Sequence, residues 1–397
     1  MIQFLHTADW QIGMKARHVA SVGEAVRAAR FNAVRNLLQI AMEKQADFVV
    51  VAGDIFEHNQ IDNRLVHKLM SILEQCPLPI YILPGNHDPL TPDSIYWRPT
   101  LTNILPSNVH IFTNPDPVEV LPGVILLPSP NFSKKSASDP TAIWSGISSG
   151  TINIGVAHGS LMIEGRHQSD DFPIALDIAE RQKLDYLALG HWHSLFSVGQ
   201  RTFYSGTPEP TGFDEPGSGC ALLVSIDGPR QEPKVEVIET GTLKWLMWEY
   251  DLEAGIDELK RWVKQWVEKL EKLETVLLRL VLSGHLSSDG SSQLEELGEW
   301  LAARLLYVDI DTSRVLTQPV TANLLNMARS QPFVQALLGD LRVTAEVLGQ
   351  PLTDLPSEFM MGTGPSEELL SEIIKKGFSA EDAALAIRVL ARLSEEV

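Results

Sequence analysis

Short apolar runs rich in β-branched residues recur across the first 240 residues, and they limit this part of the chain to a fold built on buried strands. Between the first runs, residues 21–44 and 62–75 carry apolar side chains at helical spacing. The runs predict strands at 2–7, 48–52, 80–83, 124–127, 152–157, 186–189 and 221–226. We therefore expect an α/β fold in which helices flank a β-sandwich over residues 1–240.

The pattern changes near residue 241, where a second set of elements begins. We expect strands at 243–252, 275–283 and 307–310, helices at 256–273 and 293–305, and a polar loop at 287–292. These elements predict a smaller α/β domain over residues 241–316. Residues 317–397 are expected to be helical throughout, with a helix at 331–348 and a helical pair at 366–376 and 380–396.

Composition excludes several classes of protein. No stretch approaches the roughly 18 apolar residues of a membrane span, and the N-terminus lacks the pattern of a secretory signal, so we expect a cytoplasmic protein without a membrane partner. Two cysteines, Cys76 and Cys220, are too few for a disulfide framework or a thiolate metal site. The net charge of -19 repels nucleic acid, so a DNA substrate would need bound metal ions, a local basic patch or a basic partner.

Five short motifs with metal-binding residue types follow predicted strands. In chain order they are Asp9-Trp10-Gln11, Gly53-Asp54, Gly85-Asn86-His87-Asp88, His158-Gly159 and Gly190-His191-Trp192-His193. Loops at the carboxyl ends of buried strands collect the functional groups of α/β folds, so the five motifs can converge on one cleft. Taken singly, each motif is also typical of a turn or a helix cap. Three of their glycines are expected to allow close approach to a bound ion: Gly53, Gly85 and Gly190.

The motifs provide enough ligands for two divalent ions. The candidate ligands are Asp9, Gln11, Asp54, Asn86, His158, His191 and His193. Carboxylate, amide and imidazole groups suit Mn²⁺, Fe²⁺ or Zn²⁺, and one carboxylate would have to bridge the two ions. A pair of ions ~3.5–4 Å apart is a recurrent device for hydrolysing phosphate esters. The sequence therefore predicts a phosphoester hydrolase.

The fourth candidate histidine, His87, is predicted to act on the substrate. We expect its ring to face the phosphate and the leaving oxygen, as a transition-state stabiliser or general acid. Asp88 is expected to hold the other ring nitrogen, so His87 and Asp88 are the predicted catalytic residues. Nearby Glu57 could touch the substrate side, but we favour a helix cap at this position.

With these motifs in this order, the chain resembles the calcineurin-like metallophosphoesterases, whose pattern is Asp-X-His, Gly-Asp, Gly-Asn-His, His and Gly-His-X-His. Further motifs resemble the SbcD/Mre nucleases, which are nuclease subunits of DNA repair complexes. These motifs are His6-Thr7-Ala8-Asp9-Trp10, Ala52-Gly53-Asp54-Ile55-Phe56 and Tyr204-Ser205-Gly206-Thr207-Pro208-Glu209. The resemblance implies a metal-dependent nuclease that acts on DNA ends or hairpins.

The resemblance also implies which ligands hold each ion, what the second domain does and which partners the chain binds. It places Asp9, Gln11, Asp54 and His193 on one ion and Asp54, Asn86, His158 and His191 on the other, with Asp54 as the bridge. It implies a second domain that caps the DNA site, C-terminal helices that bind the coiled coil of an SMC-like ABC-type ATPase, and a homodimer.

One position departs from the family pattern, because Gln11 stands where the family has histidine. A glutamine oxygen is a neutral and weaker ligand than an imidazole, so we expect the first ion to be held more loosely. Because this oxygen can still coordinate a hard ion, we expect Mn²⁺ as the metal, with Mg²⁺, Fe²⁺ or Zn²⁺ as alternatives. Two other functions stay open. One is a phosphodiesterase of nucleotides or other small molecules, and the other is a non-catalytic scaffold that keeps the fold for its interfaces.

Overall fold

The computed structural model of the chain describes residues 1–144, 150–165, 168–286, 288–317, 326–327, 329–347 and 386. The chain divides into two compact units, Met1–Trp245 and Leu246–Val397. The predicted helical pair at 366–376 and 380–396 lies outside the described residues, apart from Ala386. Within the described part of the chain, no helix combines the length and the apolar character that crossing a membrane requires.

Two six-stranded sheets form the first unit, and the predicted α/β fold class is confirmed. The first sheet has the order β12-β11-β1-β2-β3-β4, and the second has the order β5-β6-β7-β8-β10-β9. The strands of the first sheet are β1 Ile2–Thr7, β2 Phe48–Val51, β3 Ile80–Ile82, β4 Val109–Ile111, β11 Cys220–Ile226 and β12 Lys234–Glu239. Those of the second are β5 Val118–Leu121, β6 Val124–Ser129, β7 Ile152–His158, β8 Tyr186–Gly190, β9 Phe196–Val198 and β10 Thr202–Tyr204.

All seven strands predicted for this unit are present. The unit also contains five strands that the apolar runs do not predict: β4, β5, β9, β10 and β12. Four of the five are the edges of the two sheets. An edge strand is partly exposed and does not need a continuous apolar run, so it leaves a weak signal in the sequence. The fifth, β10, is only three residues long.

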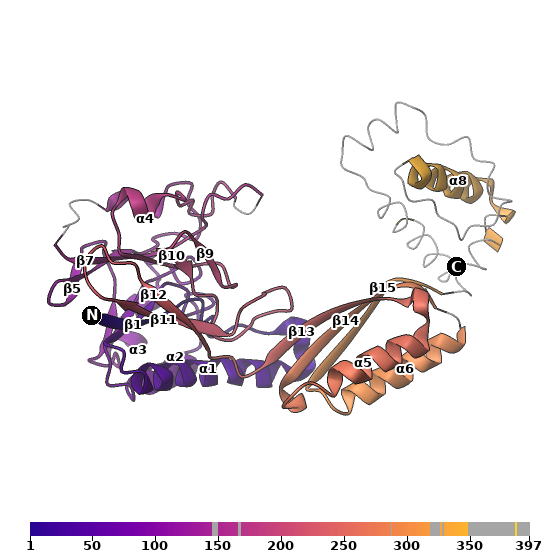
Figure 1. Cartoon of the computed structure of the whole chain (residues 1–397), viewed down its shortest axis with the longest axis horizontal. Coiled ribbons are helices and arrows are strands. Elements are labelled where there is room, and N and C mark those ends of the chain that lie inside the picture. The colour runs from indigo at the N-terminus through magenta and orange to yellow at the C-terminus, as the bar shows by residue number, and fades with distance from the viewer. Residues whose placement is uncertain are drawn as a thin grey trace. The chain divides into compact units, whose positions relative to one another are not determined.

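Helices cover the outer faces of the two sheets, which gives four layers (Figure 1). The long helices α1 Gly23–Glu43 and α2 Asn63–Leu73 pack on the first sheet, and the short α4 Ile178–Arg181 packs on the second. Successive side chains of a strand point to opposite faces, so Leu5 of β1 packs toward the helices while Phe4 packs between the sheets. Shorter helical segments are η1 Arg17–Val22, η2 Ile95–Trp97, α3 Pro99–Thr102 and η3 Pro140–Ile143.

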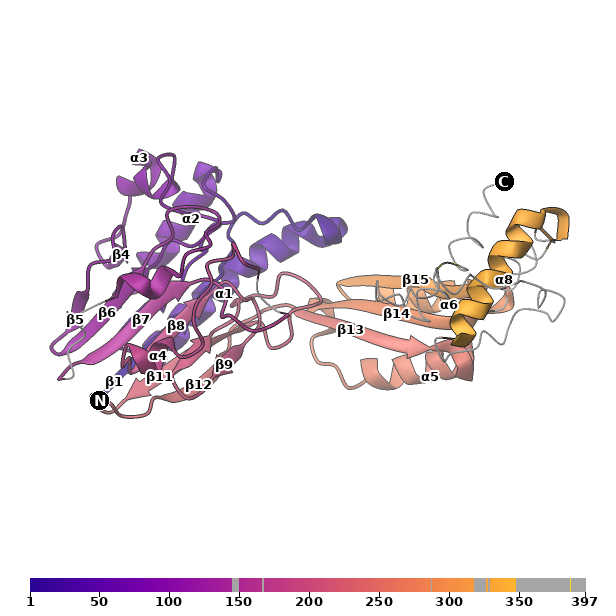
Figure 2. The same ribbon diagram turned by 90° about the horizontal axis from the view of Figure 1, so that it is seen from above.

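The second unit contains a three-stranded sheet of order β13-β14-β15, whose strands run side by side in Figure 2. Its described elements are β13 Lys244–Asp251, η4 Leu252–Ala254, α5 Ile256–Val267, η5 Leu273–Thr275, β14 Val276–Leu286, α6 Ser288–Ala302, β15 Tyr307–Thr317 and α8 Pro332–Val347. Apolar side chains of α5 and α6 form one core with the inner face of β14.

Several predicted bounds in this unit are wrong. The helix expected at 256–273, for example, ends at Val267. The polar stretch 287–292 predicts a loop, yet α6 begins at Ser288. Serine and aspartate are also typical of the first turn of a helix, so a polar run alone does not separate the two structures. Strand β15 continues to Thr317 rather than ending at residue 310, because it pairs in parallel with β14 as far as Leu286.

A buried histidine in β1 predicts a pH-dependent stability of the first unit. His6 is completely buried, its Nδ1 accepts a hydrogen bond from the Tyr186 hydroxyl (2.9 Å), and its Nε2 donates to the Leu189 carbonyl (3.2 Å). Burial lowers the pKa of His6 to about 3. An unfolded histidine protonates near pH 6.5, so between about pH 6.5 and 3 the free energy of unfolding falls by up to about 1.4 kcal/mol per pH unit because of this residue.

Replacing His6 with glutamine should remove this part of the acid sensitivity. Urea unfolding of both proteins between pH 7 and 4, in the presence of a chelator so that metal release plays no part, measures the two slopes. His67→Gln, at an exposed position of α2, controls for the loss of an imidazole. Equal slopes for His6→Gln and the unmodified chain would contradict the prediction.

Candidate metal centre

The loops that follow β1 and β2 run alongside each other and carry the first two motifs. Strands β1, β2 and β3 are parallel, so their carboxyl ends lie at the same edge of the sheet. Main-chain hydrogen bonds continue the pairing beyond the strands: the N–H of Asp9 donates to Gly53 (3.0 Å), and that of Gln11 donates to Asp54 (3.1 Å). Asp9, Gln11 and Asp54 are thereby fixed next to one another.

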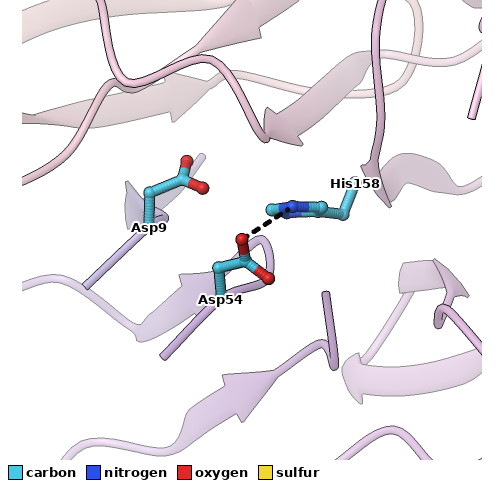
Figure 3. Close-up of side chains that lie close together, drawn as sticks. All are labelled: Asp9, Asp54 and His158. Carbon is cyan, nitrogen blue, oxygen red and sulfur yellow. Dashed lines mark ion pairs between the residues drawn. The ribbon is translucent and has the colours of Figure 1, made fainter. Parts of the chain in front are cut away.

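A buried triad lies where these loops meet the end of β7. Asp9, Asp54 and His158 each offer one ligand atom, and these atoms all lie within 4.8 Å of one another (Figure 3). Asp54 Oδ2 and His158 Nε2 are 3.3 Å apart, as the dashed line in Figure 3 marks. At most 1% of each residue is exposed. Three ligand atoms this close together can hold a metal ion.

Two further predicted ligands adjoin this triad. The side-chain oxygen of Asn86 lies 2.8 Å from His158 Nε2 and 3.0 Å from His191 Nδ1. The other nitrogen of His158 donates to the carbonyl oxygen of Ala52 at 2.8 Å, so Nε2 is the nitrogen that faces the cluster. Asp54, Asn86, His158 and His191 thus converge, as expected for the second ion.

Gln11 shows that the site fits a metal. Its amide nitrogen donates to Asp54 Oδ2 at 3.2 Å, while its oxygen is buried and has no hydrogen-bond partner among the described residues. A buried amide oxygen without a partner is unfavourable, and a half-turn of the amide would direct it to the side of Asp54. A cation beside Asp54 would satisfy that oxygen, so Gln11 is suited to be a ligand.

His193, the last predicted ligand, lies near Asp9 but hydrogen-bonds other residues. Its Nδ1 donates to Glu215 Oε1 at 2.6 Å and lies 3.2 Å from the Thr211 hydroxyl. The charge of His193 acts on the Asp9 carboxyl and opposes the rise of its pKa that burial causes. With Nδ1 engaged, Nε2 is the nitrogen that a metal ion would use.

The backbone is constrained at the candidate ligands. Asp9, Gln11, Asp54 and His191 have φ angles of 55°, 49°, 55° and 107°, in the left-handed region that residues other than glycine avoid. Such conformations cost of order 1–3 kcal/mol each and cluster at functional sites. Close approach is also required nearby, because a Cβ atom at Gly53 would overlap the His158 ring, one at Gly85 would overlap Asp54, and one at Gly190 would overlap Ala52.

Buried charges perturb one another in the cluster. Burial raises the pKa of Asp9, and His158 and His193 oppose this shift. Burial acts against ionisation of Asp54 as well, but His158 and His87 together outweigh it and lower the pKa of Asp54 below its ordinary value. Burial would lower the pKa of His158, whereas Asp54 and Asp9 raise it to about 9. The carboxylates thus attract positive charge, which a divalent cation can supply.

The predicted contact between Asp88 and the ring of His87 is wrong. Asp88 is fully buried, and its carboxylate accepts hydrogen bonds from the main-chain N–H groups of Phe56 (3.0 Å) and Gly85 (2.8 Å) and from the Tyr96 hydroxyl (2.7 Å). All three bonds tie together the loop that carries His87. Asp88 therefore acts as a positioning residue for the loop and does not hold the His87 ring.

The ring of His87 is held instead by Glu57. Its Nδ1 lies 3.0 Å from the main-chain carbonyl oxygen of Glu57, and its main-chain N–H donates to Asp54 Oδ1 at 2.9 Å. A carbonyl oxygen only accepts, so Nδ1 carries a proton and Nε2 is the nitrogen available to a substrate. The predicted helix cap at Glu57 is wrong, because Asp62 caps α2 by accepting from the N–H of Arg64.

Two carboxylates that sequence reasoning missed hold the last two histidines. Asp171 Oδ2 lies 2.8 Å from His191 Nε2, and Glu215 Oε1 lies 2.6 Å from His193 Nδ1. Each carboxylate contacts the ring nitrogen opposite to the one proposed for the metal, an arrangement common around metal-binding histidines. They lie 20 and 22 residues away from their partners in sequence, in polar loops that carry no recognisable motif.

A buried cation, Arg30 of α1, joins two loops of the site. It donates to the carbonyl oxygen of Trp10, between the ligands Asp9 and Gln11, at 2.9 Å and to that of Pro210 at 3.5 Å. Only 2% of Arg30 is exposed. No pattern in the sequence indicates this role, because an arginine within an amphipathic helix is usually exposed.

Comparison with known proteins agrees with this geometry. Residues 2–195 match the calcineurin-like phosphoesterase family. The uncharacterized metallophosphoesterase YhaO of Bacillus subtilis is 26% identical over 242 residues, which cover 57% of this chain and 57% of YhaO. The SbcD component of the nuclease SbcCD from Escherichia coli is 25% identical over 302 residues, which cover 66% of this chain and 74% of that protein. The DNA double-strand break repair protein Mre11 of Methanosarcina acetivorans is 32% identical over 90 residues, which cover 22% of this chain and 14% of Mre11.

The alignment with YhaO thus spans less than two thirds of that relative. The family match, in contrast, contains all seven candidate ligands as well as His87, from Asp9 to His193. The buried triad and the match lead to the same conclusion: residues 2–195 of this chain form a calcineurin-like phosphoesterase domain with a candidate metal site.

Proposed function

We propose that this protein is a metal-dependent DNA nuclease that hydrolyses phosphodiesters at DNA ends or hairpins. The observation that carries the proposal is the buried cluster of Asp9, Asp54 and His158, with His87 bonded to Asp54 through its main chain. DNA as the substrate is supported by two of the relatives, which are named as part of a nuclease and as a DNA double-strand break repair protein.

In this proposal the candidate ligands hold two divalent ions, Mn²⁺ by preference. Asp9, Gln11, Asp54 and His193 would hold one ion, and Asp54, Asn86, His158 and His191 the other. When bound, such a pair of ions activates water and neutralises charge on the phosphoryl oxygens. His87, fixed by Glu57 through Nδ1, would present Nε2 to the phosphate. As an imidazolium, with both ring nitrogens protonated, it would give its Nε2 proton to the leaving oxygen and keep the Nδ1 proton that bonds Glu57.

We further propose a partner, an SMC-like ATPase that binds the C-terminal helices, and a homodimer of the chain. The net charge of -19 supports a partner, because an acidic surface alone holds DNA poorly. Co-purification of the ATPase with the full chain, and its loss from a chain without residues 351–397, is the expected result. A complex that survives the deletion would contradict this docking site.

Gln11 predicts unequal affinities for the two ions. Since the glutamine oxygen is a weaker ligand than imidazole, the first ion should dissociate more readily than the second. Gln11→His should raise the affinity for the first ion by at least about tenfold, which corresponds to about 1.4 kcal/mol of binding free energy. Metal titration of the apoprotein measures this. Equal and tight uptake of two Zn²⁺ ions by the unmodified chain would contradict the prediction.

Asp171 and Glu215 should each support one ion. Asp171→Asn should lower the affinity for the ion held by His191 by about 10- to 100-fold, and Glu215→Gln should do the same for the ion held by His193. Calorimetric titration of the apoproteins with Mn²⁺ measures both sites. The neighbours supply matched controls: Asp170→Asn, which removes a surface ion pair with Lys135, and Asp214→Asn, at an exposed position. Unchanged affinity in both test variants would contradict the prediction.

The proposed function is tested by cleavage of linear duplex, hairpin and circular single-stranded DNA with Mn²⁺, beside the simple diester bis(p-nitrophenyl) phosphate. We expect DNA cleavage that a chelator abolishes and Mn²⁺ restores. Hydrolysis of the simple diester without cleavage of any DNA would favour a small-molecule phosphodiesterase. Bound metal without turnover of any substrate would favour a non-catalytic scaffold protein.

A further inference from the structure

Two aromatic side chains are exposed on the first unit, in segments that hydrogen bonds join to the loop of His87. Among the described residues of that unit, Trp97 and Phe132 are the large aromatic residues with substantial exposure, at 46% and 55%. Trp97 ends the short helix η2, and Phe132 lies in the loop after β6. Large exposed aromatic surface is unfavourable in water, so two such residues beside one site indicate a binding surface.

The loop of Phe132 is joined to the loop of His87 through Asn131. The main-chain N–H of Asn131 donates to Pro84 at 3.1 Å, and its carbonyl accepts from the N–H of Leu90 at 2.8 Å. Its side chain donates to the carbonyl oxygen of His158 at 3.2 Å. Pro84 and Leu90 bracket the Asn86–Asp88 motif, so Phe132 directly follows a residue that is bonded to both ends of the His87 loop and to the main chain of His158.

Trp97 is fixed with part of its ring exposed. Its indole N–H donates to the carbonyl oxygen of Thr91 at 3.1 Å. The segment of Thr91 is in turn held by Asn59, whose side chain donates to Pro89 at 2.9 Å and to the Thr91 hydroxyl at 3.1 Å. The ring therefore loses little freedom when a ligand stacks on it.

Positive charge accompanies each aromatic residue. Arg98 follows Trp97, and Lys134 lies two residues after Phe132. The Thr91 hydroxyl lowers the pKa of Asp93, and the charges of Arg98 and Lys134 lower it further, so both cations act electrostatically on the same carboxyl group. The chain has a net charge of -19, and these two cations give its surface local positive charge that can attract a nucleic-acid backbone.

We propose that Trp97, Arg98, Phe132 and Lys134, here called the aromatic rim, bind unpaired nucleobases of single-stranded or frayed DNA while the adjoining phosphodiester lies at His87. This inference rests on the proposed function and names the part of the substrate that is recognised. Every base has a flat face, so stacking on aromatic rings is independent of sequence. Bases in an intact duplex are already stacked, and the rim therefore favours unpaired strands.

The test compares three substrates that differ in what they offer the rim. Single-stranded oligo-dT carries bases and phosphates, an abasic oligonucleotide of the same length carries phosphates alone, and bis(p-nitrophenyl) phosphate has no nucleobase. Trp97→Ala and Phe132→Ala should each lower kcat/KM for oligo-dT by about 5- to 100-fold. Hydrolysis of the other two substrates should stay within about twofold. Phe132→Tyr should keep most of the activity, because it keeps the ring.

Val237→Ala is the matched control, since it shortens an apolar side chain of similar exposure (51%) on β12. Unchanged turnover of the simple diester shows that a variant is folded. Equal losses on all three substrates, or no loss on oligo-dT, would overturn the aromatic rim and leave the proposed nuclease intact. Hydrolysis of the simple diester alone by the unmodified chain would overturn both proposals.

Discussion

Replacing Asp54 with asparagine should reduce phosphodiester hydrolysis by about 10³-fold or more. Asp54 is the carboxylate that we propose to bridge the two ions. It contacts His158, accepts a hydrogen bond from Gln11 and accepts another from the main chain of His87. Asparagine has nearly the same shape but no negative charge. Loss of ion binding removes several kcal/mol of transition-state stabilisation, and each 1.36 kcal/mol corresponds to a factor of ten in rate.

The measurement pairs kcat/KM for bis(p-nitrophenyl) phosphate with metal content after dialysis. We expect the variant to retain less than one ion per chain. Asp62→Asn is the matched control, because asparagine caps a helix as well as aspartate does and Asp62 caps α2. An Asp54→Asn protein that retains two ions and most of its activity would refute the bridging role.

His87→Ala should separate chemistry from metal binding. The His87 ring bonds to Glu57, whereas its main-chain N–H, which alanine keeps, bonds to Asp54. We therefore expect kcat to fall by about 10²- to 10⁴-fold, the usual contribution of a general acid, while metal content stays at that of the unmodified protein.

His67→Ala, at an exposed position of α2, is the control for this substitution. Turnover and metal content are measured on the same preparations. If His87→Ala lost its metal in parallel with its activity, His87 would be a structural support of the cluster and the acid role would be wrong. If its activity were unchanged, another group would have to protonate the leaving oxygen.

Much of the site can be predicted from the sequence because parallel strands dictate where their ends meet. Asp9, Asp54 and His158 each follow an apolar run, and the structure brings their ligand atoms together although they are far apart in sequence. The central strands can be predicted because they are buried on both faces and therefore consist of continuous apolar runs. The edge strands cannot be predicted in this way, because they are partly exposed and contain polar residues.

Other features depend on loop geometry, which leaves little trace in a sequence. Asp88 adjoins His87 in the chain, and neighbouring residues suggest a contact, yet the tight loop turns its carboxylate inward to Tyr96 and two main-chain N–H groups. Asp171 and Glu215 reach the histidines from loops without motifs. Aspartate and glutamate are common in polar loops, so only the folded structure identifies these two as partners of the histidines.

The proposed chemistry depends most on two ions that Asp54 bridges in the buried cluster. Anomalous diffraction at the manganese edge, from crystals of the unmodified protein grown with Mn²⁺, tests this centre most directly. We predict two peaks ~3.5–4 Å apart, one nearer His193 and one nearer His191, with Asp54 in contact with both. A single peak, or peaks away from Asp9, Asp54 and His158, would contradict the two-ion centre.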